Sequence, residues 1–310
     1  MSSIQQIQKY WPIIMVMLFW GSMGIPSTYA VGQFSPMTVL CLRSGIGAMV
    51  LLPVVLRRCG SIRPAREERG LLLLLALVGV VACNYLYFLS VQQTSLTHVA
   101  VLYALGPIMT TVLAAVFLRE HVHLGRGVGI VLAFGGVFAL LTKGDPASFF
   151  QTGFNRGDAA ELLSSLCLAV YTILSKKLRR TPAECVTFWL MAISFAVTLP
   201  VVLLGKGAAA FRGDARGWLS VLYLGILCSG LGYLLQQRSI KLIGASASAA
   251  FLNGISPITI LTAAVILHEV ITGQQVLCMI LVFCGLVLNA RNRPGHPLVS
   301  TAEKALHGQK

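Results

Sequence analysis

Apolar residues in this sequence form long blocks that are separated by short polar links. A helix needs about 20 apolar residues to cross a hydrocarbon core about 30 Å thick. No segment shows the alternation that membrane-spanning β-strands require. The pattern therefore predicts an all-α polytopic membrane protein with ten transmembrane helices. Their expected ranges are Trp11–Val31, Pro36–Leu56, Gly70–Val91, Leu96–Leu118, Leu124–Thr142, Gly157–Leu178, Val186–Leu204, Gly217–Gln237, Ala245–Leu267 and Gln274–Ala290.

The charge of the chain supports this picture and gives it an orientation. Only 11% of the 310 residues are charged, whereas about a quarter is usual in a soluble domain. If the amino terminus is inside, 18 of the 24 Lys and Arg residues fall on the inner side and 5 on the outer side. Because positive residues concentrate in cytoplasmic links, we expect both termini in the cytoplasm. The net charge of +14 then reflects orientation in the membrane and not a nucleic-acid partner.

Neither the cysteines nor the histidines form a recognisable metal motif. The eight cysteines are scattered singly and contain no CxxC pair, so disulfide frameworks and zinc sites are not expected. His268-Glu269 could begin a zinc-protease motif, but Val-Ile-Thr follows and the second histidine is absent. The sequence predicts no cofactor.

The chain contains an internal repeat. The sequence Leu-Pro-Val-Val-Leu at 52–56 recurs at 199–203, and further matches follow with offsets of about 144 to 150. These matches predict a first five-helix repeat at 11–142, a second at 157–290 and a cytoplasmic tail at 291–310. Because five is odd, the second repeat must be inverted in the membrane. Inverted repeats are typical of secondary transporters, in which they allow alternating access to a midplane site.

Two prolines lie at matching places in the fourth and ninth expected helices. Pro107 and Pro257 each remove a backbone donor and should interrupt their helices. Interruptions at matching places in both halves point to a transport pathway, although a structural kink is the alternative. Tyr103 and Asn253 each lie four residues before these prolines, and we expect both to reach one central cavity.

Polar and aromatic side chains in the helix interiors are candidates for the same pathway. Such residues suit a pocket that stacks on a solute and forms hydrogen bonds with it. For any single tyrosine, packing between helices or a place in the interfacial belt is the alternative. The remaining candidates are Trp20, Asn84, Tyr171 and Tyr233.

Two charged residues lie within expected spans, where charges are costly and often functional. Arg43 could extend its side chain to the interface, or it could face a vestibule and meet an anionic group. Glu161 lies one turn inside the sixth helix, near the outer face, where it could belong to the same charged vestibule; a carboxylate favoured by the helix dipole is the alternative. No other acidic residue lies well within a helix, so the coupling ion stays open.

The residues now resemble the drug/metabolite transporter superfamily, in particular its EamA-type ten-helix branch. The resemblance covers roughly 12–289. One departure is that Arg119 and His268 stand where a glycine commonly precedes the glutamate. The resemblance is carried by Phe19-Trp20-Gly21-Ser22, Leu42-Arg43, Asn84-Tyr85-Leu86-Tyr87-Phe88, Thr94-Ser95, Leu105-Gly106-Pro107, Gly244-Ala245-Ser246, Pro257 and Glu269.

The resemblance implies a bundle around a central cavity and a transporter of amino acids or other metabolites, in most cases an exporter. We therefore expect a bacterial inner-membrane carrier for a small solute. The sequence does not determine the oligomeric state, and it is compatible with a monomer. An uptake permease for a nucleoside- or cofactor-like metabolite is the alternative within transport. An intramembrane enzyme or receptor is the alternative from another class, and no nucleophile–base motif favours it.

Overall fold

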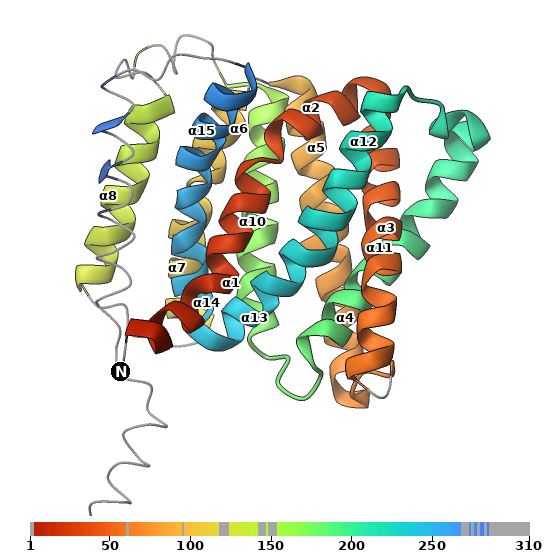
Figure 1. Ribbon diagram of the computed structural model, residues 1–310, viewed down its shortest axis with the longest axis horizontal. Coiled ribbons are helices and arrows are strands. Elements are labelled where there is room, and N and C mark those ends of the chain that lie inside the picture. Colours follow the sequence, from red (N-terminus) through yellow and green to blue (C-terminus); the bar gives the residue numbers. More distant parts are fainter. Residues whose placement is uncertain are drawn as a thin grey trace, which may run out of the picture.

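The computed structural model describes residues 3–59, 62–94, 96–117, 124–141 and 154–267, together with a few isolated positions. Every regular element in these segments is a helix, and Figure 1 shows the helices side by side in one bundle. The tenth expected span, Gln274–Ala290, and the tail lie outside the described segments. By length and composition, five of the described helices can cross a membrane, or six if a bent pair counts as one span.

The first expected span is a bent pair of helices. α1 (Ser3–Gly21) and α2 (Gly24–Gln33) meet at an angle of 43° across Ser22 and Met23. α3 (Pro36–Arg58) follows, with Pro36 at its first position and the Ser35 hydroxyl accepting from the Thr38 N–H at 3.3 Å. Proline at the first position and serine at the cap are typical helix-start residues.

The third and eighth expected spans share an unusual feature, because each contains a π-helical segment. The third comprises η1 (Arg66–Glu68), α4 (Arg69–Leu75), the π segment η2 (Ala76–Ala82) and α5 (Cys83–Gln93). The eighth comprises α12 (Ala215–Tyr223), the π segment η4 (Leu224–Gly232) and α13 (Tyr233–Ile243). Wide turns of this kind are rare and frequently mark functional sites.

The fourth and ninth expected spans are both interrupted, as their prolines predict. α6 (Leu96–Tyr103) and α7 (Gly106–Phe117) are separated by a turn directly before Pro107. In the ninth span, α14 (Ala245–Phe251) and α15 (Ile255–Leu267) are joined by the short 3₁₀ turn η5 (Leu252–Gly254).

The other described helices are α8 (Leu124–Leu141), α10 (Arg156–Ser175) and α11 (Ala183–Lys206), which the 3₁₀ turn η3 (Gly207–Phe211) follows. α10 begins with a capping box in which Asn155 and Asp158 satisfy each other's backbone N–H groups. α11 packs along α3, and α10 packs along α5, which places α10 in the interior of the bundle (Figure 1).

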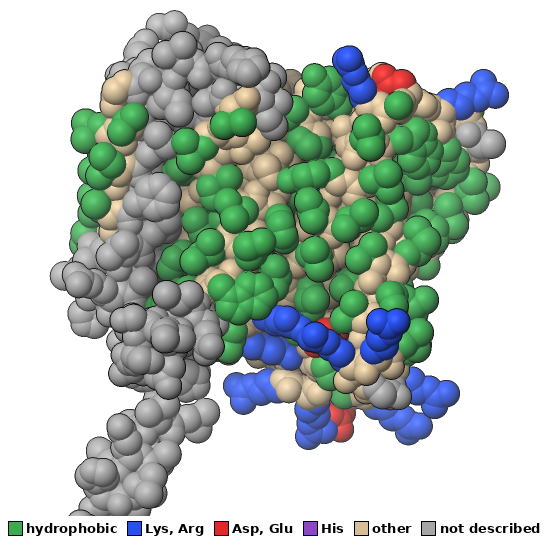
Figure 2. Space-filling view, in the orientation of Figure 1, with side chains coloured by type: hydrophobic (Ala, Val, Ile, Leu, Met, Phe, Trp, Pro, Cys, Tyr) green, Lys and Arg blue, Asp and Glu red, His purple; other side chains and the backbone are tan. Residues whose placement is uncertain are grey.

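The surface of the bundle is that of a membrane protein. Figure 2 shows apolar side chains covering the flank of the described helices, while Lys and Arg gather at one end of the bundle. Large apolar side chains such as Leu204 and Phe117 are 90% and 70% exposed. An apolar surface of this extent is unfavourable in water and fits a lipid environment.

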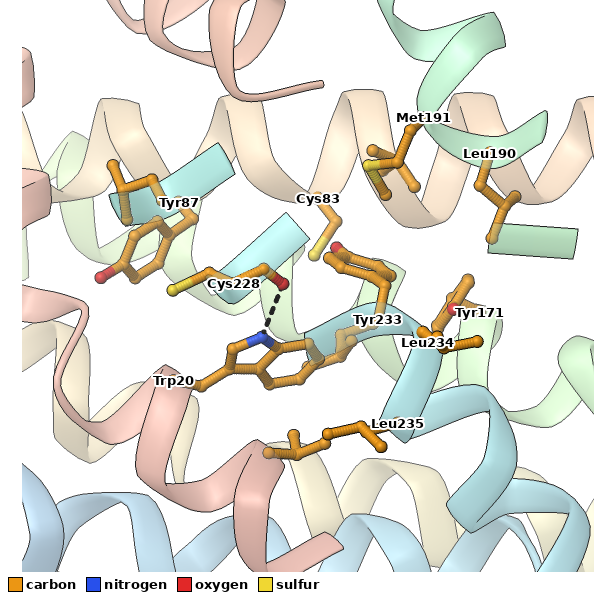
Figure 3. Close-up of a cluster of buried hydrophobic side chains, with 14 of the residues drawn as sticks. Trp20, Cys83, Tyr87, Tyr171, Leu190, Met191, Cys228, Tyr233, Leu234 and Leu235 are labelled. Carbon is orange, nitrogen blue, oxygen red and sulfur yellow. Dashed lines mark hydrogen bonds between the residues drawn. The ribbon is translucent and has the colours of Figure 1, made fainter. Parts of the chain in front are cut away.

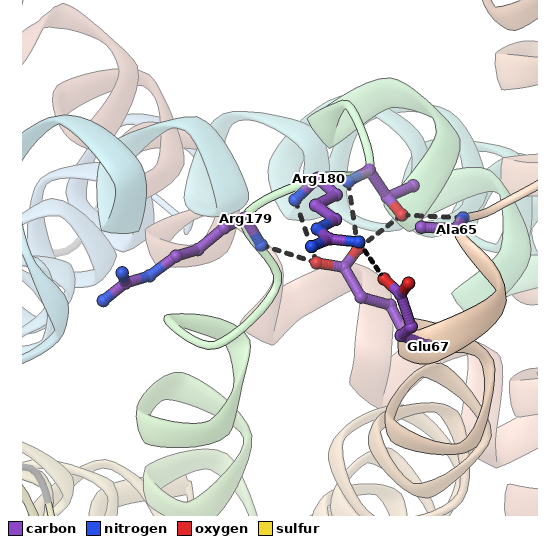
Figure 4. A network of polar contacts seen from close by, with 6 residues as sticks. Ala65, Glu67, Arg179 and Arg180 are labelled. Atoms are coloured by element: carbon purple, nitrogen blue, oxygen red, sulfur yellow. Dashed lines mark hydrogen bonds and ion pairs between the residues drawn. The ribbon is translucent and has the colours of Figure 1, made fainter.

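A polar network joins two links at the basic end (Figure 4). The Glu68 carboxylate accepts the backbone N–H groups of Arg179, Arg180 and Thr181 at 2.8, 2.9 and 2.9 Å, and the Thr181 hydroxyl at 2.5 Å. Neighbouring Glu67 pairs with the exposed Arg180 side chain. Glu68 therefore ties the link before the third span to the link before the seventh.

Candidate functional site

One small cavity lies in the interior of the bundle. Its volume is about 30 Å³, which is room for one or two water molecules and far below the about 300 Å³ or more of a typical ligand pocket. Four of its lining residues are aromatic and three are strongly polar. The lining residues are Trp20, Met23, Arg43, Cys83, Asn84, Tyr87, Tyr103, Ser164, Leu168 and Tyr233.

The irregular points of four spans converge on this cavity. Met23 lies in the bend between α1 and α2, and Tyr103 is the last residue of α6 before its break. Cys83 directly follows the π segment η2, and Tyr233 directly follows η4. Helix interruptions within a membrane persist only where protein or a wet cavity satisfies the backbone. The cavity therefore lies where these four spans depart from regular α-helix.

Arg43 is the central charged group of the site. It is 2% exposed, and its Nε donates to the Ser229 hydroxyl at 2.7 Å while Nη1 donates to Asn84 Oδ1 at 2.8 Å. The guanidinium carbon lies 5.3 Å from the centre of the Phe88 ring, a distance within the cation–π range. Arg43 thus reaches inward to the cavity, and its side chain does not extend to an interface.

The network continues from Arg43 to the second half of the chain. Asn84 Nδ2 donates to the Tyr233 hydroxyl and to the Val80 carbonyl, both at 2.8 Å. The Tyr233 hydroxyl donates in turn to the Gly79 carbonyl at 3.1 Å. Asn84 is held by three bonds, so its amide is fixed in orientation and holds Arg43 in place.

Trp20 and Tyr171 flank Tyr233 on two sides (Figure 3). The Trp20 ring centre lies 5.4 Å from that of Tyr233, and the indole N–H donates to the Cys228 carbonyl at 3.2 Å. Tyr171 packs edge-on against Tyr233 at 5.7 Å, and its hydroxyl accepts from Gln237 at 2.7 Å. Trp20 lines the cavity, whereas Tyr171 supports the cavity wall from behind.

Glu161 is fully buried on α10, one turn before the cavity residue Ser164. Its Oε1 receives a long 3.5 Å hydrogen bond from Ser165, and its Oε2 has no hydrogen-bond partner among the described residues. The role of helix-start carboxylate belongs instead to Asp158, which the Thr94 hydroxyl and His98 also contact at 2.8 and 3.0 Å.

The ninth-span candidates lie away from the cavity lining. Asn253 is buried in η5, and neither of its amide atoms has a hydrogen-bond partner within the described part of the chain. Pro107 and Pro257 are buried at the start of α7 and near the start of α15. The structure thus brings together Trp20, Arg43, Asn84, Tyr103 and Tyr233, while Tyr171, Glu161, Asn253 and the two prolines lie outside the lining.

Sequence reasoning did not select several residues that build the site. Met23, Cys83 and Leu168 line the cavity, and Ser229 binds Arg43. Three of these four are apolar or weakly polar and look like ordinary membrane-helix residues. The only signal for Ser229 is a polar residue in the middle of an apolar span, and it becomes informative only once Arg43 is known to point inward.

No group of three or more His, Cys, Asp or Glu residues that could hold a metal ion occurs in the described segments. The arrangement offers hydrogen-bond donors, aromatic faces and one cation. It therefore suits reversible binding of a small solute.

Comparison with known proteins assigns the family. A profile of the EamA-like transporter family matches residues 9–142 and, a second time, residues 155–291. This chain belongs to the EamA-like transporter family. As a member of this family, it is a multi-pass membrane protein and a transporter.

Several similar proteins are consistent with this assignment. The chain is 25% identical over 291 residues to the uncharacterized transporter YyaM of Bacillus subtilis, covering 93% of this chain and 95% of the relative. It is 24% identical to the probable terminal-alkyne amino-acid exporter of Streptantibioticus cattleyicolor, covering 84% and 86% of the two chains. A WAT1-related protein of Arabidopsis thaliana is also 24% identical, over 84% of this chain and 79% of the relative.

A solved crystal structure has the same fold. It superimposes with a TM-score of 0.75 at 18% sequence identity, over 91% of this EamA-like chain and 96% of the other. At this level of identity the likeness concerns the fold alone.

Proposed function

We propose that this EamA-like protein is a secondary transporter that moves a small metabolite, an amino acid or similar solute, out of the cell by alternating access. The observation that carries the proposal is the buried cavity in which Arg43, Asn84 and Tyr233 form one network at the point where four spans lose their regular helix. Discontinuous transmembrane helices around an interior polar site are typical of secondary transporters.

The two inverted five-helix repeats, 11–142 and 157–290, are part of the same proposal. The π segments in the third and eighth spans support it, as do the breaks in the fourth and ninth. Spans three and four thus have irregularities of the same kind as spans eight and nine, which is the relation expected between repeats. The ten-helix count includes the tenth span, 274–290, and rests on its hydropathy.

The small volume of the cavity supports alternating access. A space of about 30 Å³ cannot hold a metabolite, so a solute can bind only after the surrounding spans move apart. The bend at Ser22 and Met23 and the break after Tyr103 are natural places for this motion, because element ends absorb most of the backbone change in hinge movements.

Orientation and direction rest on charge and on a relative. Lys and Arg gather at one end of the bundle (Figure 2). The 18-to-5 asymmetry of the sequence supports the proposal that this end and both termini face the cytoplasm of a bacterial inner membrane. Export is supported by the name of the Streptantibioticus relative, an amino-acid exporter. Uptake of a nucleoside- or cofactor-like metabolite is the alternative within transport.

The test is transport by the purified protein in proteoliposomes. A thermal-shift screen against amino acids, nucleosides and drugs first selects ligands, because a compound that binds the native state raises its melting temperature. Counterflow of each radiolabelled hit is then measured with the parent and with Asn84→Ala, which breaks the network. We expect flux in the parent and at least tenfold less in the variant. If no hit of the screen moves in the parent, the proposal fails.

A further inference from the structure

The hydrogen bonds of Arg43 leave part of its guanidinium available. Nε and Nη1 each have a partner at 2.7 and 2.8 Å, whereas no hydrogen bond involves Nη2 among the described residues. Arginine has five N–H donors in a rigid planar fork. Because Arg43 also lines the cavity, its unused donors lie beside this interior space.

Among the described residues, Arg43 forms no salt bridge with a carboxylate within 4 Å. Its partners are a hydroxyl, an amide oxygen and the face of an aromatic ring. These dipoles hold the guanidinium in position but carry no net charge. A buried cation without a counter-ion is expensive, and arginine stays charged at every physiological pH. Binding of an anion beside Arg43 is therefore electrostatically favourable.

The other residues that line the cavity indicate the chemistry of the rest of the solute. Trp20, Tyr87, Tyr103 and Tyr233 place aromatic surfaces around the cavity, with the apolar Met23 and Leu168. Aromatic faces favour an apolar or aromatic body, and a planar guanidinium edge matches the two oxygens of a carboxylate.

We propose that Arg43 is the recognition residue for the carboxylate of the transported solute, and that the solute is a small organic acid or amino acid with an apolar or aromatic body. This inference rests on the proposed transport function and names the substrate class for it. When the spans open, Nη2 donates to the carboxylate, and the negative charge of the solute compensates the positive charge of Arg43.

Ser229 and Asn84 are positioning residues in this site. Each binds the guanidinium from a different span, η4 and α5, and together they fix the plane of the fork. Loss of the Ser229 hydroxyl should weaken carboxylate binding by a few fold while leaving the charge in place.

The experiment measures binding of matched probes by calorimetry to the purified full-length chain. Phenylpropanoate is an anion, phenylpropanamide is a neutral compound of nearly the same shape, and phenylpropylamine is a cation. The parent should bind the anion at least tenfold more tightly than the other two. Arg43→Gln should weaken phenylpropanoate about 10- to 100-fold, as expected for lost charge-assisted hydrogen bonds, and should leave the amide unchanged.

Three further variants separate recognition from folding. Arg43→Lys keeps the charge but loses the fork, so it should fall between the parent and Arg43→Gln. Ser229→Ala tests the positioning role. Ser44→Ala is the matched control, because Ser44 is an equally buried serine on α3 that bonds Ser194 on α11 at 2.9 Å and does not line the cavity. It should bind the anion like the parent.

The outcomes distinguish this inference from the transport proposal. If the amide or the amine binds as tightly as the anion, or if well-folded Arg43→Lys and Ser229→Ala bind the anion like the parent, the inference is wrong. It is also wrong if the parent binds no carboxylate. In each of these cases transport of neutral or cationic solutes in proteoliposomes would leave the transport proposal standing.

Discussion

The Glu68 network at the basic end allows a quantitative prediction. Its carboxylate accepts four hydrogen bonds, three of them from consecutive backbone N–H groups at 179–181. In Glu68→Gln, only the amide oxygen can still accept, and the new NH₂ group faces donors. At least one backbone N–H and the Thr181 hydroxyl then lose their acceptor.

The cost follows from these losses. Each buried donor left without a partner costs about 1–3 kcal/mol, so the two donors lost in Glu68→Gln should destabilise the protein by about 2–6 kcal/mol. At about 2–4 °C per kcal/mol for a large domain, the melting temperature should fall by about 4–24 °C. Neighbouring Glu67→Gln is the matched control. Its pair with Arg180 is about 70% exposed on both sides, and such pairs contribute about 0–1 kcal/mol.

Thermal unfolding of both variants in the same detergent, followed by fluorescence, measures the two effects. The expected result is a large shift for Glu68→Gln and a shift within about 2 °C for Glu67→Gln. Equal shifts for the two variants would refute the reasoning, because they would mean that the geometry of the network does not determine its energy.

Three further predictions concern the interior. Gly79→Ala should destabilise the protein by about 1–3 kcal/mol in thermal unfolding, because its Cβ would lie 2.2 Å from Tyr171 Cδ2. Gly70→Ala is the control and should not destabilise the protein, because its Cβ would meet nothing within 4 Å. Asn253→Ala should keep or raise the melting temperature, since both amide atoms are buried without partners in the described segments, but should lose or alter transport in proteoliposomes; unchanged flux would contradict the role of Asn253. Glu161→Gln should also not lower the melting temperature, because the carboxylate that it replaces is buried and one of its oxygens has no hydrogen-bond partner among the described residues. A clear decrease would mean that the carboxylate makes a stabilising contact.

Hydropathy predicted the bounds of several described helices closely, because lipid imposes a simple length rule. The expected Pro36–Leu56 is Pro36–Arg58 in the structure, and the expected Leu124–Thr142 is Leu124–Leu141. Proline chemistry likewise located the interruption before Pro107. The π segment Ala76–Ala82 had no such signal, since an apolar run looks the same whether its backbone is α or π.

The candidate site was predicted in type but not in detail. Helical spacing can say that Tyr171 and Tyr103 face the interior, but not which one lines the cavity and which one stands behind Tyr233. Arg43 shows the same limit. Whether its long side chain reaches an interface or turns inward depends on Ser229, which lies 186 residues away in sequence. Tertiary packing determines these side-chain orientations, and a local sequence pattern contains no information about it.

The π segments have a consequence for how this sequence can vary. Aromatic donors use main-chain acceptors in both segments: Trp20 donates to the Cys228 carbonyl, and Tyr233 donates to that of Gly79. A main-chain acceptor survives substitution of its own residue, whereas a donor is lost with its ring. Cys228 should therefore tolerate Ala or Ser, while Trp20 and Tyr233 should be intolerant. Mutational scanning would thus find constraint on Trp20 but not on its acceptor Cys228, whereas Gly79 is constrained for a different reason, because a Cβ there would meet the Tyr171 ring.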